Sequence, residues 1–370
     1  MKWSAPAVSG TQPDLSGHSS TLVMLPRGNG ESQWHNLSAT PNAPHLFVLG
    51  GKAKDCATGT SSYSSALHVL NVESGAWSRK SAQADFVDND ALDSWDGREG
   101  HSATLVGAYI YVFGGVNDES GFTGKNDLLR LGVRPEAESG KFVWTILQRG
   151  GDAAPSARKG HVAALLSARY FVITGGFDDA NSVRDDVWVY DHGKSGTLGD
   201  GCSSFVSQDR EGAAGDTLGD VCKWSRPALK QQGHGGLVGD GPLPRQGASG
   251  AVLGERTAVS GNAQLLLVGG HDDSLATYYN DAWLLRVQSK RGAAADQTKG
   301  SPSDWYWQQV SMDNGDLASD TDMQIPERRS DMGMVYIPSY VHMLSLGDAA
   351  YAVRTAPLSA SGSGSGSGSG

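Results

Sequence analysis

The sequence predicts an all-β protein assembled from repeated units of short strands, on the basis of its composition and of an internal repetition. Glycine supplies 50 of the 370 residues without a triplet period, and 10 tryptophans and 11 tyrosines accompany it. Such a composition is typical of many short strands joined by tight turns. One strand motif then recurs four times along the chain, and recurrence of this kind indicates a repeat architecture.

The recurring motif is an apolar run that ends in a pair of glycines. It occupies residues 45–51, 109–115, 170–176 and 264–270. Glycine tolerates positive φ and close backbone approach, so each pair is interpreted as a sharp turn after a buried strand. The pairs are farther apart than the roughly 50 residues of a typical four-stranded repeat, and we expect the excess to lie in loops.

Three further strand motifs surround each glycine pair. A strand of small residues precedes the pair, and we expect it to lie innermost, near a crowded axis. An alternating strand and a short strand with tryptophan follow the pair. Four strands in each unit predict the blade of a β-propeller. The first strands are expected at 17–23, 100–106, 160–166 and 247–253, the third strands at 67–72, 126–131, 186–191 and 280–287, and the tryptophans of the fourth are Trp77, Trp144, Trp224 and Trp305 or Trp307.

Taken together, these motifs resemble the Kelch repeat, which reads Arg-x-Gly-His, an apolar strand ending in Gly-Gly, Asn-Asp-x-Trp-x-Tyr-Asp and a later tryptophan. The resemblance covers residues 3 to about 357. It implies a Kelch-type β-propeller, and the tryptophans are expected to pack between neighbouring blades because of their large apolar area.

The last unit is degenerate, and it suggests how the ring closes. Residues 329–336 begin like an inner strand, 340–348 keep only one glycine of the pair, and no tryptophan strand follows. Lys2-Trp3-Ser4-Ala5-Pro6 reads like the fourth strand at 223–227. We therefore expect five four-stranded blades, with the last completed by the N-terminal strand, an arrangement that hides open sheet edges.

This prediction divides the chain into one propeller, 1–358, and a Ser/Gly tail or linker, 359–370, that is excluded from the fold. The units are approximately 7–78, 79–148, 149–227, 228–311, and 312–358 together with 1–6.

Charge and hydropathy exclude several classes of partner. The formal net charge is -10 and no run of lysines and arginines is present, which argues against nucleic acid and anionic membranes. There is no long apolar segment or apolar signal region after Lys2, so a cytoplasmic, intracellular location is expected. Cys56, Cys202 and Cys222 lack metal-ligand spacing, and either reduced thiols or a Cys202–Cys222 disulfide would fit them.

Catalytic and metal-binding motifs are absent from the sequence, so no catalytic residue, metal, cofactor or small-molecule substrate is expected. Some propellers that resemble this family hold iron through Glu-x-x-x-Asp-x-x-x-His, and this chain lacks that run. His18, His101 and His161 follow a glycine at the same strand start. Repeat geometry is the preferred interpretation of these histidines.

Arginines recur two residues before the inner-strand glycine, and two roles are open for them. By resemblance to Kelch substrate adaptors, they would lie at the mouth of the central channel and bind carboxylates of a protein partner through bidentate hydrogen bonds. Alternatively, each pairs with a nearby Asp or Glu and ties its blade to the next. The four arginines are Arg98, Arg158, Arg245 and Arg329.

A second candidate surface is the inserted loop at 82–97, which combines acidic and aromatic side chains. Phe86, Asp88, Asp90 and Trp95 are its candidate partner-binding residues, and they would suit a basic partner. The alternative is a solvated loop without a binding role.

The function expected from these observations is a non-catalytic protein–protein interaction scaffold or substrate-recognition module, which uses one propeller face and its inserted loops. A regulatory Kelch domain of a larger enzyme, such as a phosphatase or a ubiquitin-ligase adaptor, is the alternative. A metal-dependent Kelch enzyme is the third possibility.

Overall fold

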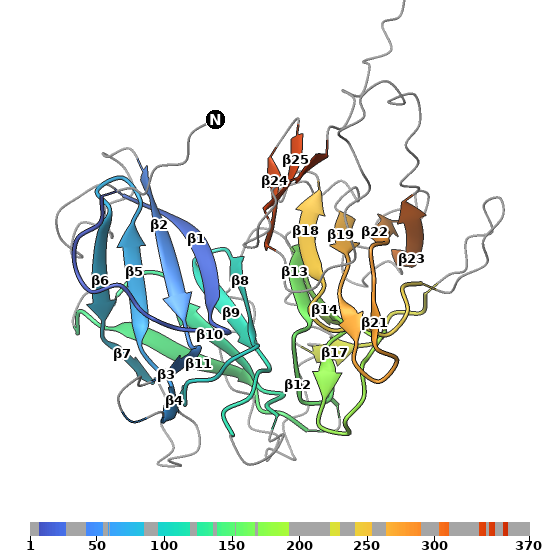
Figure 1. Ribbon diagram of the computed structural model, residues 1–370, viewed down its shortest axis with the longest axis horizontal. Coiled ribbons are helices and arrows are strands. Elements are labelled where there is room, and N and C mark those ends of the chain that lie inside the picture. Colours follow the sequence, from blue (N-terminus) through green and yellow to red (C-terminus); the bar gives the residue numbers. More distant parts are fainter. Residues whose placement is uncertain are drawn as a thin grey trace, which may run out of the picture.

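The described secondary structure is entirely β, in three four-stranded sheets, one five-stranded sheet, one three-stranded sheet and three two-stranded sheets (Figure 1). Across the described residues there is no helix that could span a membrane. The computed structural model describes residues 7–26, 42–54, 58, 60–84, 95–118, 124–135, 139–151, 153–166, 169–191, 223–229, 241–253, 264–289, 303–310, 333–337, 340–344 and 351–353.

The first blade shows how the sequence pattern makes a sheet. Its strands run antiparallel in the order β1 (Ser19–Pro26), β2 (Asn42–Leu49), β5 (Leu67–Asn71) and β6 (Ala76–Lys80). Along β1, Val23 and Leu25 are buried whereas Leu22 and Met24 are exposed. This alternation follows from the two-residue period of a strand and directs one face of the blade toward its neighbour.

The next three blades repeat the same order and confirm the predicted all-β propeller. Blade two contains β8 (Ser102–Val106), β9 (Tyr109–Phe113), β10 (Leu128–Gly132) and β11 (Phe142–Gln148), blade three β13 (Val162–Leu166), β14 (Tyr170–Thr174), β16 (Val187–Asp191) and β17 (Lys223–Ser225), and blade four β18 (Ser249–Leu253), β19 (Gln264–Val268), β22 (Ala282–Ser289) and β23 (Ser303–Val310).

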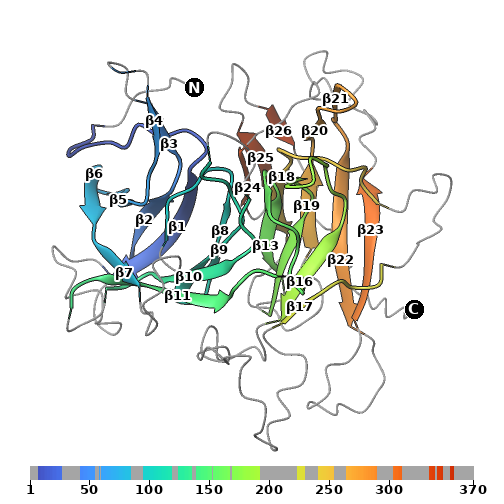
Figure 2. The same cartoon turned by 90° about the horizontal axis from the view of Figure 1, so that it is seen from below.

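A fifth sheet follows, and the first strands of successive sheets touch one another. It consists of β24 (Gly333–Ile337), β25 (Tyr340–Leu344) and β26 (Tyr351–Val353). Contacts run from β1 to β8, β13, β18 and β24 in turn, so these strands surround the axis, whereas β6 and β23 lie at the periphery (Figures 1 and 2). Residues 1–6 lie outside the described residues, and closure into five complete blades stays a prediction.

The core lies between the blades, and the tryptophans of the outer strands of blades two to four are part of it, as expected, whereas Trp77 of β6 is only partly buried. Trp144 packs between blades one and two, and Trp224 between blades two and three. Trp305 and Trp307 pack between blades three and four. Each therefore buries its large apolar area at a blade junction rather than within a single sheet.

Between blades, the chain pairs with the next outer strand before it turns inward. After β6, β7 (Ala82–Ala84) pairs parallel with β11 of blade two. After β17, Leu229 forms a parallel bridge with Trp305 of blade four, and Ser9 forms one with Ala76 of blade one. The same crossing therefore occurs at three places in the described chain.

Short two-stranded sheets gather at the end of the propeller where the inner strands begin (Figure 1). They pair β3 (Lys52–Lys54) with β4 (Ser61–Tyr63), β12 (Arg158–Lys159) with β15 (Phe177–Asp178), and β20 (His271–Asp272) with β21 (Thr277–Tyr278). We call this end the rim face.

Candidate functional site

A chain of three backbone hydrogen bonds runs around the axis at the rim face and links the first four blades. The glycine before each inner strand donates its N–H to the carbonyl of the corresponding glycine in the preceding blade, at 2.9 Å each time. These glycines have φ near +60°, a left-handed conformation that other residues adopt only at a cost. The donors are Gly100, Gly160 and Gly247, and the chain of bonds starts at the carbonyl of Gly17.

The residue before each of these glycines occupies the same backbone position in every blade, but its side chain differs from blade to blade. We call Ser16, Glu99, Lys159 and Gln246 the rim positions, and each is partly or fully exposed. Each is also bridged to the residue after a Gly-Gly pair, as Glu99 is to Val116 and Gln246 to His271. A uniform, hydrogen-bonded backbone thus presents four unlike side chains around the channel.

The recurrent arginines lie beneath the rim positions and are buried. Arg98, Arg158 and Arg245 are only 1%, 0% and 2% exposed. Each forms a bidentate ion pair with the aspartate that precedes the third strand of its own blade, and each donates to the carbonyl of the first glycine of the Gly-Gly pair. The aspartates are Asp127, Asp186 and Asp281, and the carbonyls are those of Gly114, Gly175 and Gly269.

The electrostatics of these pairs keep both partners charged. Burial would lower the pKa of Arg98, but the charge of Asp127 and its hydrogen bonds raise that pKa above its ordinary value. Burial would likewise raise the pKa of Asp186, but the hydrogen bonds and charge of Arg158 hold it below the usual range. The neutral forms are therefore disfavoured at neutral pH.

These contacts agree with the alternative in which each arginine pairs with a nearby acidic residue and has a structural role. The guanidinium groups are bonded within their own blades, whereas the arginine main chain ties each blade to the one before it: the N–H groups of Gly51, Gly115 and Gly176 donate to the carbonyls of Arg98, Arg158 and Arg245, at 2.8 Å. Contact with a partner would require the side chains to leave these bonds. The groups available to a partner are therefore the exposed residues around them.

The aspartates of these pairs were not singled out from the sequence, although a signal for them existed. Asp186 and Asp281 belong to the repeated Asp-x-Trp pattern, and each also accepts a hydrogen bond from the indole two residues later, Trp188 or Trp283. The Asp-x-Trp motif therefore supplies one carboxylate that accepts hydrogen bonds from both an arginine and a tryptophan.

The motif histidines join neighbouring inner strands, in agreement with the interpretation from repeat geometry. His101 Nε2 lies 2.8 Å from Ser19 Oγ of blade one, and His161 Nε2 lies 2.8 Å from Ser102 Oγ of blade two. Burial, followed by the charge of the nearby arginine, lowers the pKa of each ring to about 3. Both imidazoles are neutral at pH 7. His18 is exposed and bonds the carbonyl of Leu15.

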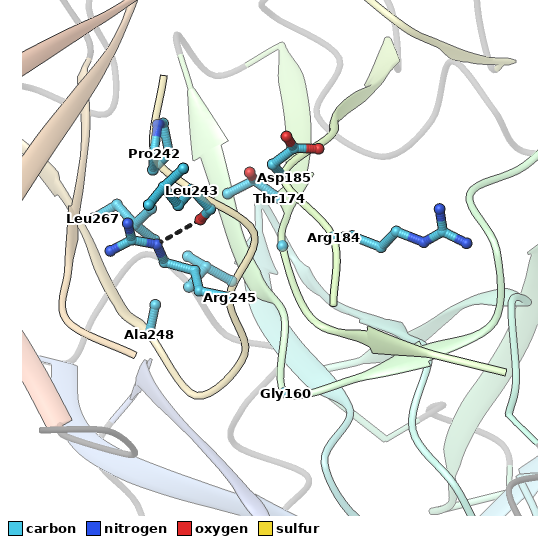
Figure 3. A pocket seen from close by; sticks show the side chains of 11 residues that line it. Gly160, Thr174, Arg184, Asp185, Pro242, Leu243, Arg245, Ala248 and Leu267 are labelled. Carbon is cyan, nitrogen blue, oxygen red and sulfur yellow. Dashed lines mark hydrogen bonds between the residues drawn. The ribbon is translucent and has the colours of Figure 1, made fainter. Parts of the chain in front are cut away.

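The junction of blades three and four lacks this pair and contains a small pocket instead. Ala248 occupies the histidine position and Val162 the serine position, and both line the pocket. Its volume is about 10 Å³, enough for a water-sized group. Figure 3 shows Leu243 and Arg245 on one wall, with the Arg245 Nε–H donating to the Leu243 carbonyl at 2.9 Å.

Trp95, a candidate partner-binding residue of the inserted loop, is buried in the structure. Its side chain is 7% exposed and stacks on Trp144, with ring centroids 4.8 Å apart. Arg98 lies over its ring. Trp95 thus belongs to the core between blades one and two, because an aromatic ring in an acidic segment can still find an apolar cleft.

Other candidate residues lie outside the described residues, so their binding roles stay predictions: Arg329, Phe86, Asp88, Asp90 and the three cysteines. Across the part of the chain that the structure describes, no three His, Cys, Asp or Glu side chains gather as metal ligands would.

Repeated four-stranded blades, rim glycines and arginine–aspartate pairs define a β-propeller built from Kelch-type repeats. The family model of the KLHDC2/KLHL20/DRC7 Kelch-repeats domain matches residues 1–196, which is more than half of the chain. The chain belongs to the Kelch-repeat family.

Individual relatives match over shorter parts of their length. Acyl-CoA-binding domain-containing protein 4 of Arabidopsis thaliana is 27% identical over 164 residues, which is 44% of this chain and 18% of that protein. Kelch domain-containing protein 3 of Rattus norvegicus is 25% identical over 196 residues, 52% of this chain and 42% of that protein, and the Mus musculus protein matches equally. The chain matches less than half the length of these relatives.

Proposed function

We propose that this chain is a non-catalytic protein-interaction module that recognises a partner protein through its rim face. The observation that carries the proposal is the series of rim positions. Hydrogen bonds at 2.9 Å fix the backbone of successive blades, whereas the side chains on it are a serine, a glutamate, a lysine and a glutamine. A fixed backbone with unlike, exposed side chains suits recognition because little ordering cost is added on binding.

The buried arginines support this proposal indirectly. Their ion pairs and carbonyl contacts hold the loops of the rim face in place without occupying its surface. Recognition residues on loops that a scaffold holds in place are a common arrangement. Rim side chains are therefore the groups we expect to contact the partner.

Charge reversal at the rim tests the proposal. Glu99→Lys and Lys159→Glu invert adjacent rim charges, and we expect each to abolish capture of the partner proteins that the unmodified chain retains. Lys141→Glu is the matched control, because Lys141 is exposed and precedes β11 at the opposite end of blade two. Quantitative affinity capture from cell extract compares the three variants.

The test compares partner capture by the two rim variants with capture by the variant at the opposite end of the propeller. Partners lost from both rim variants and retained by Lys141→Glu would support the rim face. Retention of the same partners by all three folded variants would contradict it.

A module of a larger regulatory protein is the second candidate. The match to the Arabidopsis protein covers only 18% of that protein, so the matching segment there lies beside other sequence. The rim face would then serve to recruit a substrate or regulator to chemistry located elsewhere.

A further inference from the structure

The pocket between blades three and four occupies the place where the other blades insert a histidine. A Cβ built on Gly114 would meet the His161 ring at 2.8 Å, and one on Gly50 would meet the His101 ring at 2.5 Å. At Gly175, the corresponding glycine, the three nearest atoms are all backbone atoms of Arg245 and Arg184, and none belongs to a side-chain ring. The histidine seat is therefore vacant at this junction and opens on the rim face.

Two oxygen-bearing side chains in the pocket have no partner among the described residues. Thr174 is 2% exposed, yet its hydroxyl makes no hydrogen bond to a described residue, and the exposed Asp185 carboxylate forms no ion pair with one. The Thr174 hydroxyl is not among the fully enclosed polar atoms without a partner and it lines the pocket, so this group is available to a ligand. Both side chains belong to blade three and line the pocket (Figure 3).

The local charge balance favours a cation in the pocket. Arg245 is neutralised by its bidentate pair with Asp281. Arg184 is paired with Asp178, and its side chain extends away from Arg245 (Figure 3). The Asp185 carboxylate is thus the remaining charge of the pocket.

We propose that this vacant histidine seat receives the ammonium group of a lysine side chain from the partner protein. A lysine ammonium is close to water in size and has three donors, which suits a pocket of about 10 Å³ with the Thr174 hydroxyl and the Asp185 carboxylate as acceptors. The lysine methylenes would lie along Pro242 and Leu243, which is 61% exposed. This inference rests on the proposed use of the rim face by a protein partner.

A lysine analogue tests the pocket directly. Nα-acetyl-lysine methylamide is titrated into the full chain, and the amide signals of Gly175 and Ala248 are followed by NMR. We expect saturable shifts at both signals. The Nε-acetylated analogue, which lacks the charge, should bind at least about tenfold more weakly, because its hydrogen bonds to the pocket are no longer charge-assisted.

Variants of the pocket distinguish specific binding of the lysine analogue in the pocket from a general attraction between opposite charges. Asp185→Asn should weaken the lysine analogue about tenfold, whereas Asp179→Asn, an exposed carboxylate of the same loop that does not line the pocket, should leave it unchanged. Val162→Ser with Ala248→His rebuilds the pair seen at the other junctions and should abolish binding. Thr174→Val serves as a second test that leaves the volume of the side chain almost unchanged.

Three results would overturn the inference: no saturable shift, equal shifts with the Nε-acetylated analogue, or unchanged binding in the folded Val162→Ser, Ala248→His variant. Selection of phage-displayed hexapeptides on the chain distinguishes this failure from that of the proposed function. Peptides without lysine that still require Glu99 and Lys159 would leave the rim face supported and the pocket inference rejected. If the lysine analogue binds but the rim variants capture partners as the unmodified chain does, only the proposed function of the rim face would be rejected.

Discussion

At the scale of single residues, the arginine–aspartate pairs differ in how completely their donors are matched. All five N–H groups of Arg158 have acceptors, because Ser156 supplies its carbonyl and hydroxyl. Arg245 uses four, since Leu243 offers only a carbonyl at the corresponding place. A buried pair contributes stability only when its remaining donors are satisfied, so Arg158 is the best place to measure the effect.

We expect Asp186→Asn to destabilise the fold by about 3 kcal/mol, because it leaves the buried Arg158 charge without its counter-ion. Asp191→Asn is the matched control: it removes the bidentate partner of Arg169, but that pair is partly exposed and should cost about 1 kcal/mol or less. Urea unfolding of both variants gives the comparison, and equal losses would show that burial does not govern these pairs.

Acid should weaken the fold through His101 and His161. Their pKa is about 3 in the folded chain against an ordinary 6.5, so the unfolded chain binds protons that the folded chain does not. Stability is complete above pH 6.5 and falls as the pH drops from there toward 3. By pH 5 the loss is about 2 kcal/mol for each histidine.

Urea unfolding at pH 7 and pH 5 measures this loss. In His161→Gln the pH-dependent loss should be smaller by about 2 kcal/mol, because one of the two groups no longer titrates. A pH dependence identical to that of the unmodified chain would assign the effect to other groups.

At the scale of the elements, the glycine pairs are required by space as well as by conformation. Gly114 has φ +70°, and a Cβ there would lie 2.5 Å from the Arg158 carbonyl oxygen. Gly140 has φ +63° with nothing within 4 Å. We expect Gly140→Ala to cost about 1 kcal/mol for its conformation alone, and Gly114→Ala at least about 2 kcal/mol more. Thermal unfolding of the two variants separates the contributions, and equal shifts would contradict the steric part.

The strands could be predicted from the sequence because each motif repeats with its physical constraint. Gly-Gly pairs favour sharp turns, and the tryptophan strands were placed between blades by their apolar area alone. The burial of Trp95 was not predicted, since acidic neighbours suggested exposure whereas the cleft beside Trp144 buries it. The pocket could not be predicted, because it arises from residues that depart from the motif, Val162 and Ala248.

At the scale of the whole molecule, the described crossings bear on ring closure. The chain crosses to the outer strand of the next blade just after β6 and just after β17, and Ser9 makes the same crossing to blade one. The segment before Ser9 would therefore belong to the outer strand of the preceding blade, which in a closed ring is the last. This reasoning supports the predicted role of Trp3.

We expect Trp3→Ala to lower the free energy of unfolding by about 3 kcal/mol, the usual cost of removing a packed tryptophan. Deletion of the Ser/Gly tail at 359–370 is the control and should have no effect. Differential scanning calorimetry measures both. An unchanged transition in Trp3→Ala would exclude closure by the N-terminal strand.

The missing histidine between blades three and four also determines where the propeller should open locally. Gly100, Gly160 and Gly247 donate backbone hydrogen bonds of equal length, 2.9 Å, but only the junction closed by Gly247 lacks a serine–histidine pair among these three. Amide hydrogen exchange reports local opening, so the protection factor of Gly247 should be the lowest of the three. The junction between blades three and four, which has room for a ligand, would then also be the junction that a bound ligand stabilises most against local opening.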